Sequence, residues 1–171
     1  AKGIVGPWVH KYPHFAIPEP RIGFLQEAMR WWDRWLKDIE TGVEADPDYR
    51  VYLMDGMRPA AWVSQRPGRW IAETDGATSH LAEKVLHLTD NGLTDDTGTL
   101  SSVIQSPAHC GADAGEYCAI WLGPEMPGDQ RGDDALSRCF DSDSLTRDMD
   151  IVGAPRLSLT VASDQPQAQI A

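Results

Sequence analysis

The spacing of turn residues changes at residues 44–48 (EADPD) and constrains the fold more than any other feature of the chain. Beyond this point, short runs typical of β-strands are separated by clusters of Pro, Gly, Asn and Asp. Several short strands with turn signals between them predict a β-sandwich or barrel. We therefore expect a mainly β domain, with candidate strands at 50–54, 61–64, 69–73, 84–89, 99–104, 119–122 and 156–163.

The stretch 156–163 shows the strand pattern most clearly. Leu157, Leu159 and Val161 share one face of an extended chain, and the polar residues between them share the other. This strict alternation predicts a strand with one buried face and one face in water.

A helix precedes the β-rich part, from about Ile22 to Ile39. Apolar residues recur there at the i, i+3, i+4 and i+7 spacing of a helix packed on one side, and most charged residues lie off this stripe. Gly42 is the expected C-cap. The apolar stripe consists of Ile22, Leu25, Ala28, Met29, Trp32, Trp35, Leu36 and Ile39.

The chain opens on residues 2–8, which we interpret as a strand with no turn or cap before it, followed by a proline-rich connection over 11–21. His10 comes just after this strand, where open α/β sheets place ligand-binding and catalytic groups. We regard it as the sharpest candidate for chemistry, and the alternative is a hydrogen-bonded histidine on a surface loop. The last residues, AQIA (168–171), resemble half of another strand, so both ends suggest a fragment.

Composition excludes several classes of function. The chain has 171 residues and a net charge of −11, without a basic cluster, which argues against nucleic acid and anionic membrane surfaces as partners. No apolar run approaches the roughly 20 residues that span a bilayer. Three cysteines form no disulfide framework, and we favour free thiols in a cytoplasmic protein over a bridge between Cys110 and Cys118.

Three sets of side chains could ligate a metal, but each is weak, and we expect neither a metal nor a cofactor. Pro13 prevents the first pair from sharing one face of a regular helix, and the second set lies in a Gly/Ala loop. The third set consists of three aspartates whose spacing does not match an EF-hand loop, and ion pairing of these aspartates with Arg131 is the better explanation for them. The sets are His10 with His14, His109 with Cys110 and Cys118, and Asp129 with Asp133 and Asp134.

Four ordered segments carry a resemblance that covers essentially the whole chain. The chain resembles the bacterial cocaine esterase and X-prolyl dipeptidyl peptidase hydrolases, the CocE/NonD family. Members of this family have an α/β-hydrolase domain, an inserted helical cap and a C-terminal jelly-roll β-sandwich. The segments are GPWVH with GFLQEAMRWWDRWLKDIETGV, then MRPAAWVSQRPGRWIAE, PGDQRGDD and CFDSDSLTRDMDIVGAPRLSLTVASDQPQAQIA.

The resemblance implies that residues 1–45 are the last strand and C-terminal helix of an α/β-hydrolase domain. Residues 46–171 would then be a galactose-binding-like jelly-roll β-sandwich, cut before its final strands. The family's triad runs Ser, Asp, His along the chain, and His10 matches the histidine, the general base and acid of acyl transfer. The Ser and Asp partners are absent from this chain, in which no G-x-S-x-G motif occurs.

The implied activity is therefore that of a serine ester or amide hydrolase, to which this chain contributes the histidine and the sandwich. Its partners would be a small ester or amide substrate and the upstream hydrolase and cap domains, and we expect the 171-residue chain alone to be inactive. One alternative is a non-catalytic carbohydrate- or ligand-binding β-sandwich, which the seven Trp residues favour. Another is a homo-oligomer that associates through Trp32, Trp35 and Leu36.

Overall fold

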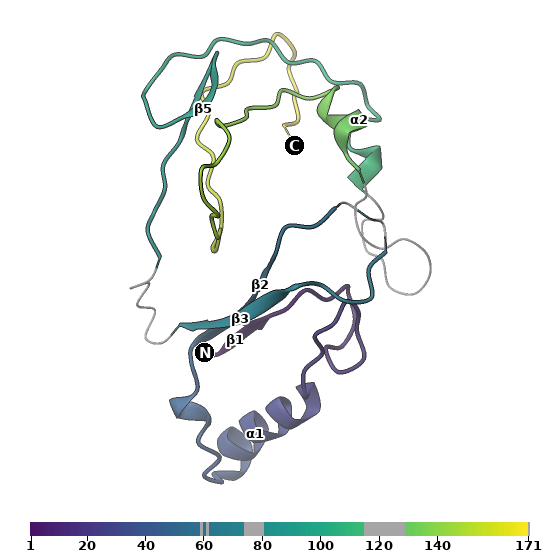
Figure 1. Ribbon diagram of the computed structural model, residues 1–171, viewed down its shortest axis with the longest axis vertical. Coiled ribbons are helices and arrows are strands. Elements are labelled where there is room, and N and C mark those ends of the chain that lie inside the picture. The colour runs from purple at the N-terminus through teal and green to yellow at the C-terminus, as the bar shows by residue number, and fades with distance from the viewer. Residues whose placement is uncertain (59, 61, 74–80, 115–128, 171) are drawn as a thin grey trace.

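The computed structural model describes residues 1–58, 60, 62–73, 81–114 and 129–170 (Figure 1). Most of the regular structure lies in the first half of the chain, and long extended segments connect the remaining elements. None of the helices in this described part is long and apolar enough to cross a membrane. The elements are β1 (Gly3–Val5), α1 (Phe24–Lys37), η1 (Val43–Ala45), β2 (Tyr49–Met54), β3 (Gly68–Glu73), β4 (His87–Thr89), β5 (Gly92–Thr94), η2 (Ala112–Ala114) and α2 (Arg131–Asp134).

Strands β1, β2 and β3 form a three-stranded sheet in that order. β1 runs parallel to β2, with Gly3 opposite Tyr49, and β2 pairs with β3 in antiparallel register from Tyr49–Glu73 to Met54–Gly68. The predicted strands at 50–54 and 69–73 are confirmed, each beginning one residue earlier. The first strand is shorter than predicted because Pro7 follows it and has no N–H to donate to a ladder.

Helix α1 confirms the helix expected near 22–39, and it lies below the sheet in Figure 1. It ends at Asp38, which adopts the left-handed conformation (φ 57°) and donates its backbone N–H to the carbonyl of Asp33. The expectation that Gly42 caps this helix is therefore wrong. Gly42 is also left-handed (φ 74°), but it precedes the short turn η1.

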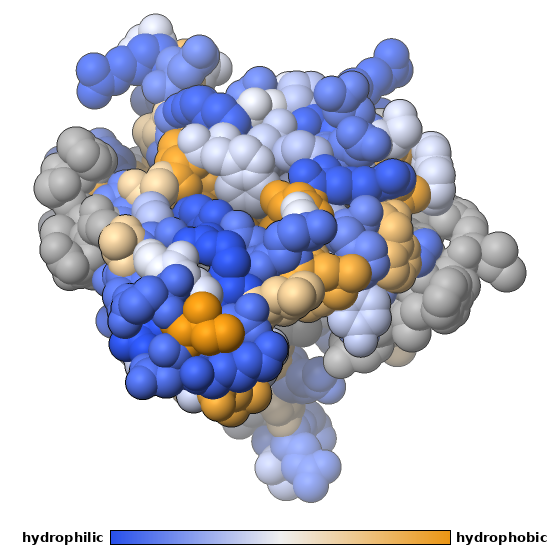
Figure 2. Space-filling view, turned by 90° about the horizontal axis from the view of Figure 1, so that it is seen from below, coloured by the Kyte–Doolittle hydropathy of each residue, from blue (hydrophilic) through white to orange (hydrophobic). Residues whose placement is uncertain are grey.

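The face of α1 that meets the rest of the chain is not the expected one. No residue of α1 is buried, and six of the eight residues of the apolar stripe are exposed, from 48% at Ile39 to 72% at Leu36. Apolar patches are visible among polar side chains when the molecule is seen from the end at which α1 lies (Figure 2). The exposed members of the stripe are Leu25, Met29, Trp32, Trp35, Leu36 and Ile39.

Strands β4 and β5 form a separate hairpin, and β4 is the part of the predicted strand at 84–89 that is confirmed. Its turn is closed by the hydroxyl of Thr89, which accepts the backbone N–H of Asn91 (3.2 Å) and donates to the carbonyl of Gly92 (3.0 Å). The backbone N–H of Leu93 also donates to the carbonyl of Asp141 (2.9 Å), which ties the hairpin to a later segment.

The expected sandwich is not formed by the described residues, which show a mixed fold, low in regular structure, with two small open sheets and no barrel. Three of the expected strands are irregular where the structure describes them, at 99–104, 156–163 and the described part of 61–64. A fourth, at 119–122, lies outside the described residues. Leu157, Leu159 and Val161 are exposed. Alternation predicts a strand only where a neighbour pairs with the backbone and covers the apolar face, and none of the described segments does so for 156–163.

Few hydrophobic side chains are buried among the described residues. Leu53 of β2, Val43 of η1 and Ala16 of the loop before α1 are the buried hydrophobic members, and Pro18 of the same loop is also fully buried. A core of this size leaves the pairing of β2 with β3 as a main source of stability, because these strands share six residue pairs.

We predict that Gly68→Ala destabilises the chain by about 1–3 kcal/mol. Gly68 has a φ of 154°, and a Cβ there would collide with the backbone oxygen of Leu53 across the ladder. Gly56→Ala is the matched control, since a Cβ at Gly56 meets no atom within 4 Å. Urea unfolding followed by Trp fluorescence measures both free energies, and equal losses in the two variants would contradict this account.

Candidate functional site

The loop between β1 and α1 holds His10, and it is a fixed scaffold despite its prolines. Trp8 Nε1 donates to the carbonyl of Pro20 (2.7 Å), and the backbone N–H of Val9 donates to the carbonyl of Ile17 (2.9 Å). Glu19 makes a β-bridge with Gln65 of the segment before β3. His10 lies exposed at a bend of this loop, beyond the C-terminal end of β1, as the sequence predicts.

His14, the second histidine of this loop, belongs to a cluster of aromatic rings. Its ring lies 4.7 Å from that of Phe15 and stacks nearly parallel to that of Phe24, at 6.0 Å. Tyr12 stacks on Phe24 at 5.6 Å. The Nδ1 atom of His14 is buried in this cluster without a hydrogen-bond partner. These contacts assign His14 to packing rather than to a metal site shared with His10.

Asp129, Asp133 and Asp134 do not form the cation site that their spacing could suggest. Arg131 donates Nε to both carboxylate oxygens of Asp129 (2.9 Å each), which confirms the expected Asp–Arg pairing and holds the pKa of Asp129 below its ordinary value. Asp133 turns inward and accepts the backbone N–H of Asp113 (2.7 Å). Within the described residues, no three His, Cys, Asp or Glu side chains are grouped to hold a metal.

The described cysteines lie on either side of helix α2. Cys110 Sγ is 3.2 Å from the hydroxyl of Ser137, and Cys139 donates to the carbonyl of Asp134 (3.5 Å). Both are free thiols, as expected, and Cys118 lies outside the described residues. His109 is exposed next to Cys110.

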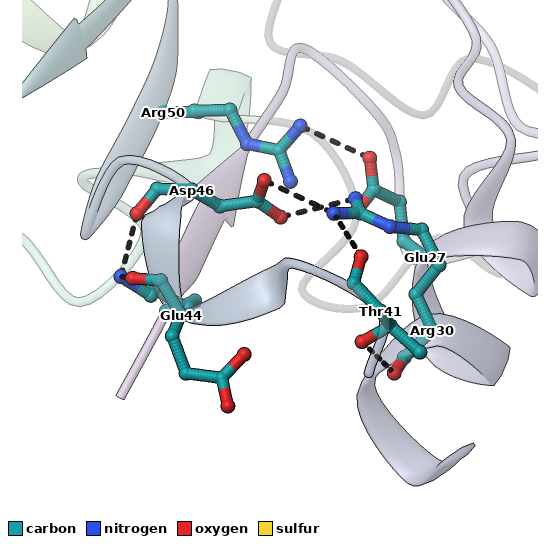
Figure 3. Close-up of polar contacts among 7 residues, drawn as sticks. Glu27, Arg30, Thr41, Glu44, Asp46 and Arg50 are labelled. Atoms are coloured by element: carbon teal, nitrogen blue, oxygen red, sulfur yellow. Dashed lines mark hydrogen bonds and ion pairs between the residues drawn. The ribbon is translucent and has the colours of Figure 1, made fainter. Parts of the chain in front are cut away.

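A network of charges joins α1 to the segment that leads into β2 (Figure 3). Arg30 holds Asp46 with both terminal nitrogens, Nη1 at 3.0 Å and Nη2 at 3.1 Å, and approaches Glu27 at 3.4 Å. Glu27 in turn accepts Nη1 of Arg50 in β2 at 3.0 Å. The hydroxyl of Thr41 donates to the backbone carbonyl of Arg30 (3.0 Å). Helix α1 is thus attached through its polar face.

Further ion pairs extend this network to both sides. Arg34 pairs with Glu44 and, at 2.5 Å, with Asp38. Lys2, just before β1, pairs with Asp48 at 2.9 Å. The hydrogen bond from Arg34 holds the pKa of Glu44 below its ordinary value, because it stabilises the carboxylate. The same attachment therefore depends on carboxylates that acid can neutralise.

Sequence reasoning did not identify this network, although two signals for it are present. Glu27, Arg30 and Arg34 are spaced three and four residues apart, so they share the helix face that the apolar stripe leaves free. The acidic segment EADPD follows at residues 44–48 and supplies their partners. Charged helix faces are usually solvated, and this is why the pattern alone does not indicate a contact.

Residues 41–171 match a known family, described as the X-Pro dipeptidyl-peptidase C-terminal non-catalytic domain. No curated protein and no solved structure matches the chain. The match begins at Thr41, between α1 and η1. The charge network therefore joins two parts of the chain, since β1, His10 and α1 lie before the matched domain while Asp46 and Arg50 lie within it.

We predict that Glu44→Gln lowers stability near neutral pH and has progressively less effect as the pH falls. A carboxyl whose pKa is depressed in the folded state contributes stability above its ordinary pKa of 4.5 and loses it as the pH falls through the folded value. Wild type and variant should therefore converge once the pH lies below the depressed pKa of Glu44 in the folded state. Thermal unfolding at low salt measures this, with the exposed Glu83→Gln as control; a constant difference at all pH values would contradict it.

Proposed function

The chain belongs to the X-Pro dipeptidyl-peptidase C-terminal domain family, and from this we propose that it is the C-terminal part of a serine hydrolase of esters or amides. The matched domain is itself non-catalytic and would accompany catalytic domains in the full protein. Any contribution to chemistry must then come from residues 1–40. The observation that carries the proposal is the position of His10 in this segment, at the end of a strand and before the matched domain.

His10 is proposed as the histidine of the catalytic triad. In acyl transfer, a serine attacks the ester or amide carbonyl, and the histidine takes the proton of the serine and returns it to the leaving group. An aspartate holds the imidazole in the required tautomer. The exposure of His10 and the hydrogen bonds that fix its loop support this role, because a general base must be accessible and held in position.

Residues 1–45 are proposed as the last strand and C-terminal helix of an α/β-hydrolase domain. The order of strand β1 and then helix α1 within this segment supports this, since strands followed by helices characterise such sheets. Residues 46–171 would complete a galactose-binding-like jelly roll in the whole protein. The exposed Leu157, Leu159 and Val161 support the completion, because a sandwich would cover them.

The apolar stripe of α1 is proposed as a contact with the catalytic part of the protein. The charged face of α1 already holds the matched domain, so the stripe is left for another partner. Large exposed apolar side chains gathered on one helix face mark an interaction surface rather than a solvated one. Trp32, Trp35 and Leu36, each more than half exposed, are its centre.

We predict that His10→Ala, made in the whole protein, lowers kcat/KM for an ester substrate by roughly a thousandfold or more. Labelling of the serine by a fluorophosphonate probe, read by intact mass, should slow in parallel because the nucleophile is no longer activated. His109→Ala is the control and should leave both readouts unchanged. Undiminished turnover in His10→Ala would exclude this histidine from the mechanism. In a separate experiment, labelling of the isolated 171-residue chain by the probe would show that this chain has an activated serine of its own.

We predict that Leu36→Asp weakens binding of this chain to the separately expressed catalytic part by at least about tenfold. Burying a leucine contributes about 1.5–3 kcal/mol, and tenfold corresponds to about 1.4 kcal/mol. Gln26→Asp adds the same charge off the stripe and should bind as wild type. Isothermal titration calorimetry measures both affinities, and equal affinities would place the contact elsewhere.

A further inference from the structure

A groove lies between the beginning of α1 and the face of the sheet that α1 covers. Ile4, Arg50 and Ala72 form one row across the three strands, since Ile4 pairs with Arg50 and Arg50 with Ala72. Glu27 approaches this row from α1. The space enclosed here has a volume of about 310 Å³, at the small end of the range for ligand pockets.

The lining of the groove combines apolar walls with one ion pair. Ile22, Trp70 and Ile71 add to the apolar surface of Ile4 and Ala72. Glu27 and Arg50 supply the charges among the described lining residues, one of each sign and 3.0 Å apart. Their side chains are 28% and 29% exposed, so solvent and small molecules can reach both.

Both charged groups retain capacity for a further partner. A guanidinium carries five N–H donors, and a single one of those of Arg50 is used by Glu27. A carboxylate offers about four acceptor positions, of which Glu27 uses one for Arg50 and one for Arg30. A ligand can therefore bind to either group without first displacing a full set of hydrogen bonds.

The neutral ion pair selects the charge of the ligand. A simple anion on Arg50 would lie beside the carboxylate of Glu27 and be repelled by it. A simple cation on Glu27 would be repelled by the guanidinium of Arg50 in the same way. A zwitterion satisfies both groups at once, provided that its two charges are as close together as those of Glu27 and Arg50.

We propose that the groove binds a small apolar α-amino acid, with its carboxylate on Arg50 and its ammonium on Glu27. The nitrogen and the carboxyl carbon of an α-amino acid lie about 2.5 Å apart, which matches the adjacent protein charges. Each further residue of a peptide separates the two charges by about 3.3–3.6 Å more, so peptides fit less well. The aliphatic side chain contacts Ile4, Ile22 and Trp70. This inference goes beyond the proposed hydrolase and stands on its own.

The test is calorimetric titration of the 171-residue chain with L-leucine. Saturable binding of L-leucine is expected. N-acetyl-L-leucine and L-leucinamide each lack one charge and should bind at least about tenfold more weakly than L-leucine. Glycine, which keeps both charges and lacks the side chain, should also bind at least about tenfold more weakly. The absence of saturable leucine binding, or equal binding of either capped compound, would overturn the proposal.

Two variants place the binding in the groove. Ala72→Leu fills the groove with a larger side chain and should abolish leucine binding, whereas Ala154→Leu, at an exposed position outside the lining, should bind as wild type. Circular dichroism checks that both fold. Should Ala72→Leu unfold, Glu27→Gln gives the answer, since it should remove the preference for leucine over N-acetyl-leucine. Unchanged binding in Ala72→Leu, or an unchanged preference in Glu27→Gln, would contradict the site.

Discussion

The ion pair between Arg30 and Asp46 is the contact on which the arrangement of the described residues depends. β1 and β2 are parallel neighbours, so the chain must cross over between them, and α1 is part of that crossover. A crossover helix ordinarily covers its sheet with an apolar stripe. Here two nitrogens of Arg30 bind the carboxylate of Asp46 just before β2, and one nitrogen of Arg50 binds Glu27 over the sheet itself.

Such an attachment is weaker than a hydrophobic one. Ion pairs with partly exposed side chains contribute little individually, because solvent screens them and ordering long side chains opposes them. These ion pairs contribute more because they form one connected network, in which each carboxylate is held by at least one cation. The network consists of Glu27, Arg30, Asp46 and Arg50. With few buried apolar residues among those described, this set is a substantial part of what fixes α1 in place.

The sequence predicted those elements whose signal is local, and failed where the outcome depends on a distant partner. The helix at Phe24–Lys37 and the strands at Tyr49–Met54 and Gly68–Glu73 follow from periodicity and turn residues within each segment. The stretch 156–163 has an equally clear pattern, but no other strand pairs with it in the described residues. For the site, the position of His10 beyond a strand could be predicted, whereas its triad role rests on a resemblance. The charge network could not be predicted from the sequence, because the spacing of charged residues identifies a charged helix face but not the segment that this face contacts.

The same limit explains why the apolar stripe of α1 was expected to face inward. Amphipathicity shows that a helix has two different faces, and it does not show which one a given part of the chain will cover. On the proposed arrangement each face has its own partner, the charged face the non-catalytic domain and the apolar face the catalytic part. Salt and acid weaken the first contact and leave the second largely unaffected, because apolar burial depends on neither charge nor protonation. In the whole protein, α1 would therefore stay with the catalytic part under conditions that release the non-catalytic domain from it.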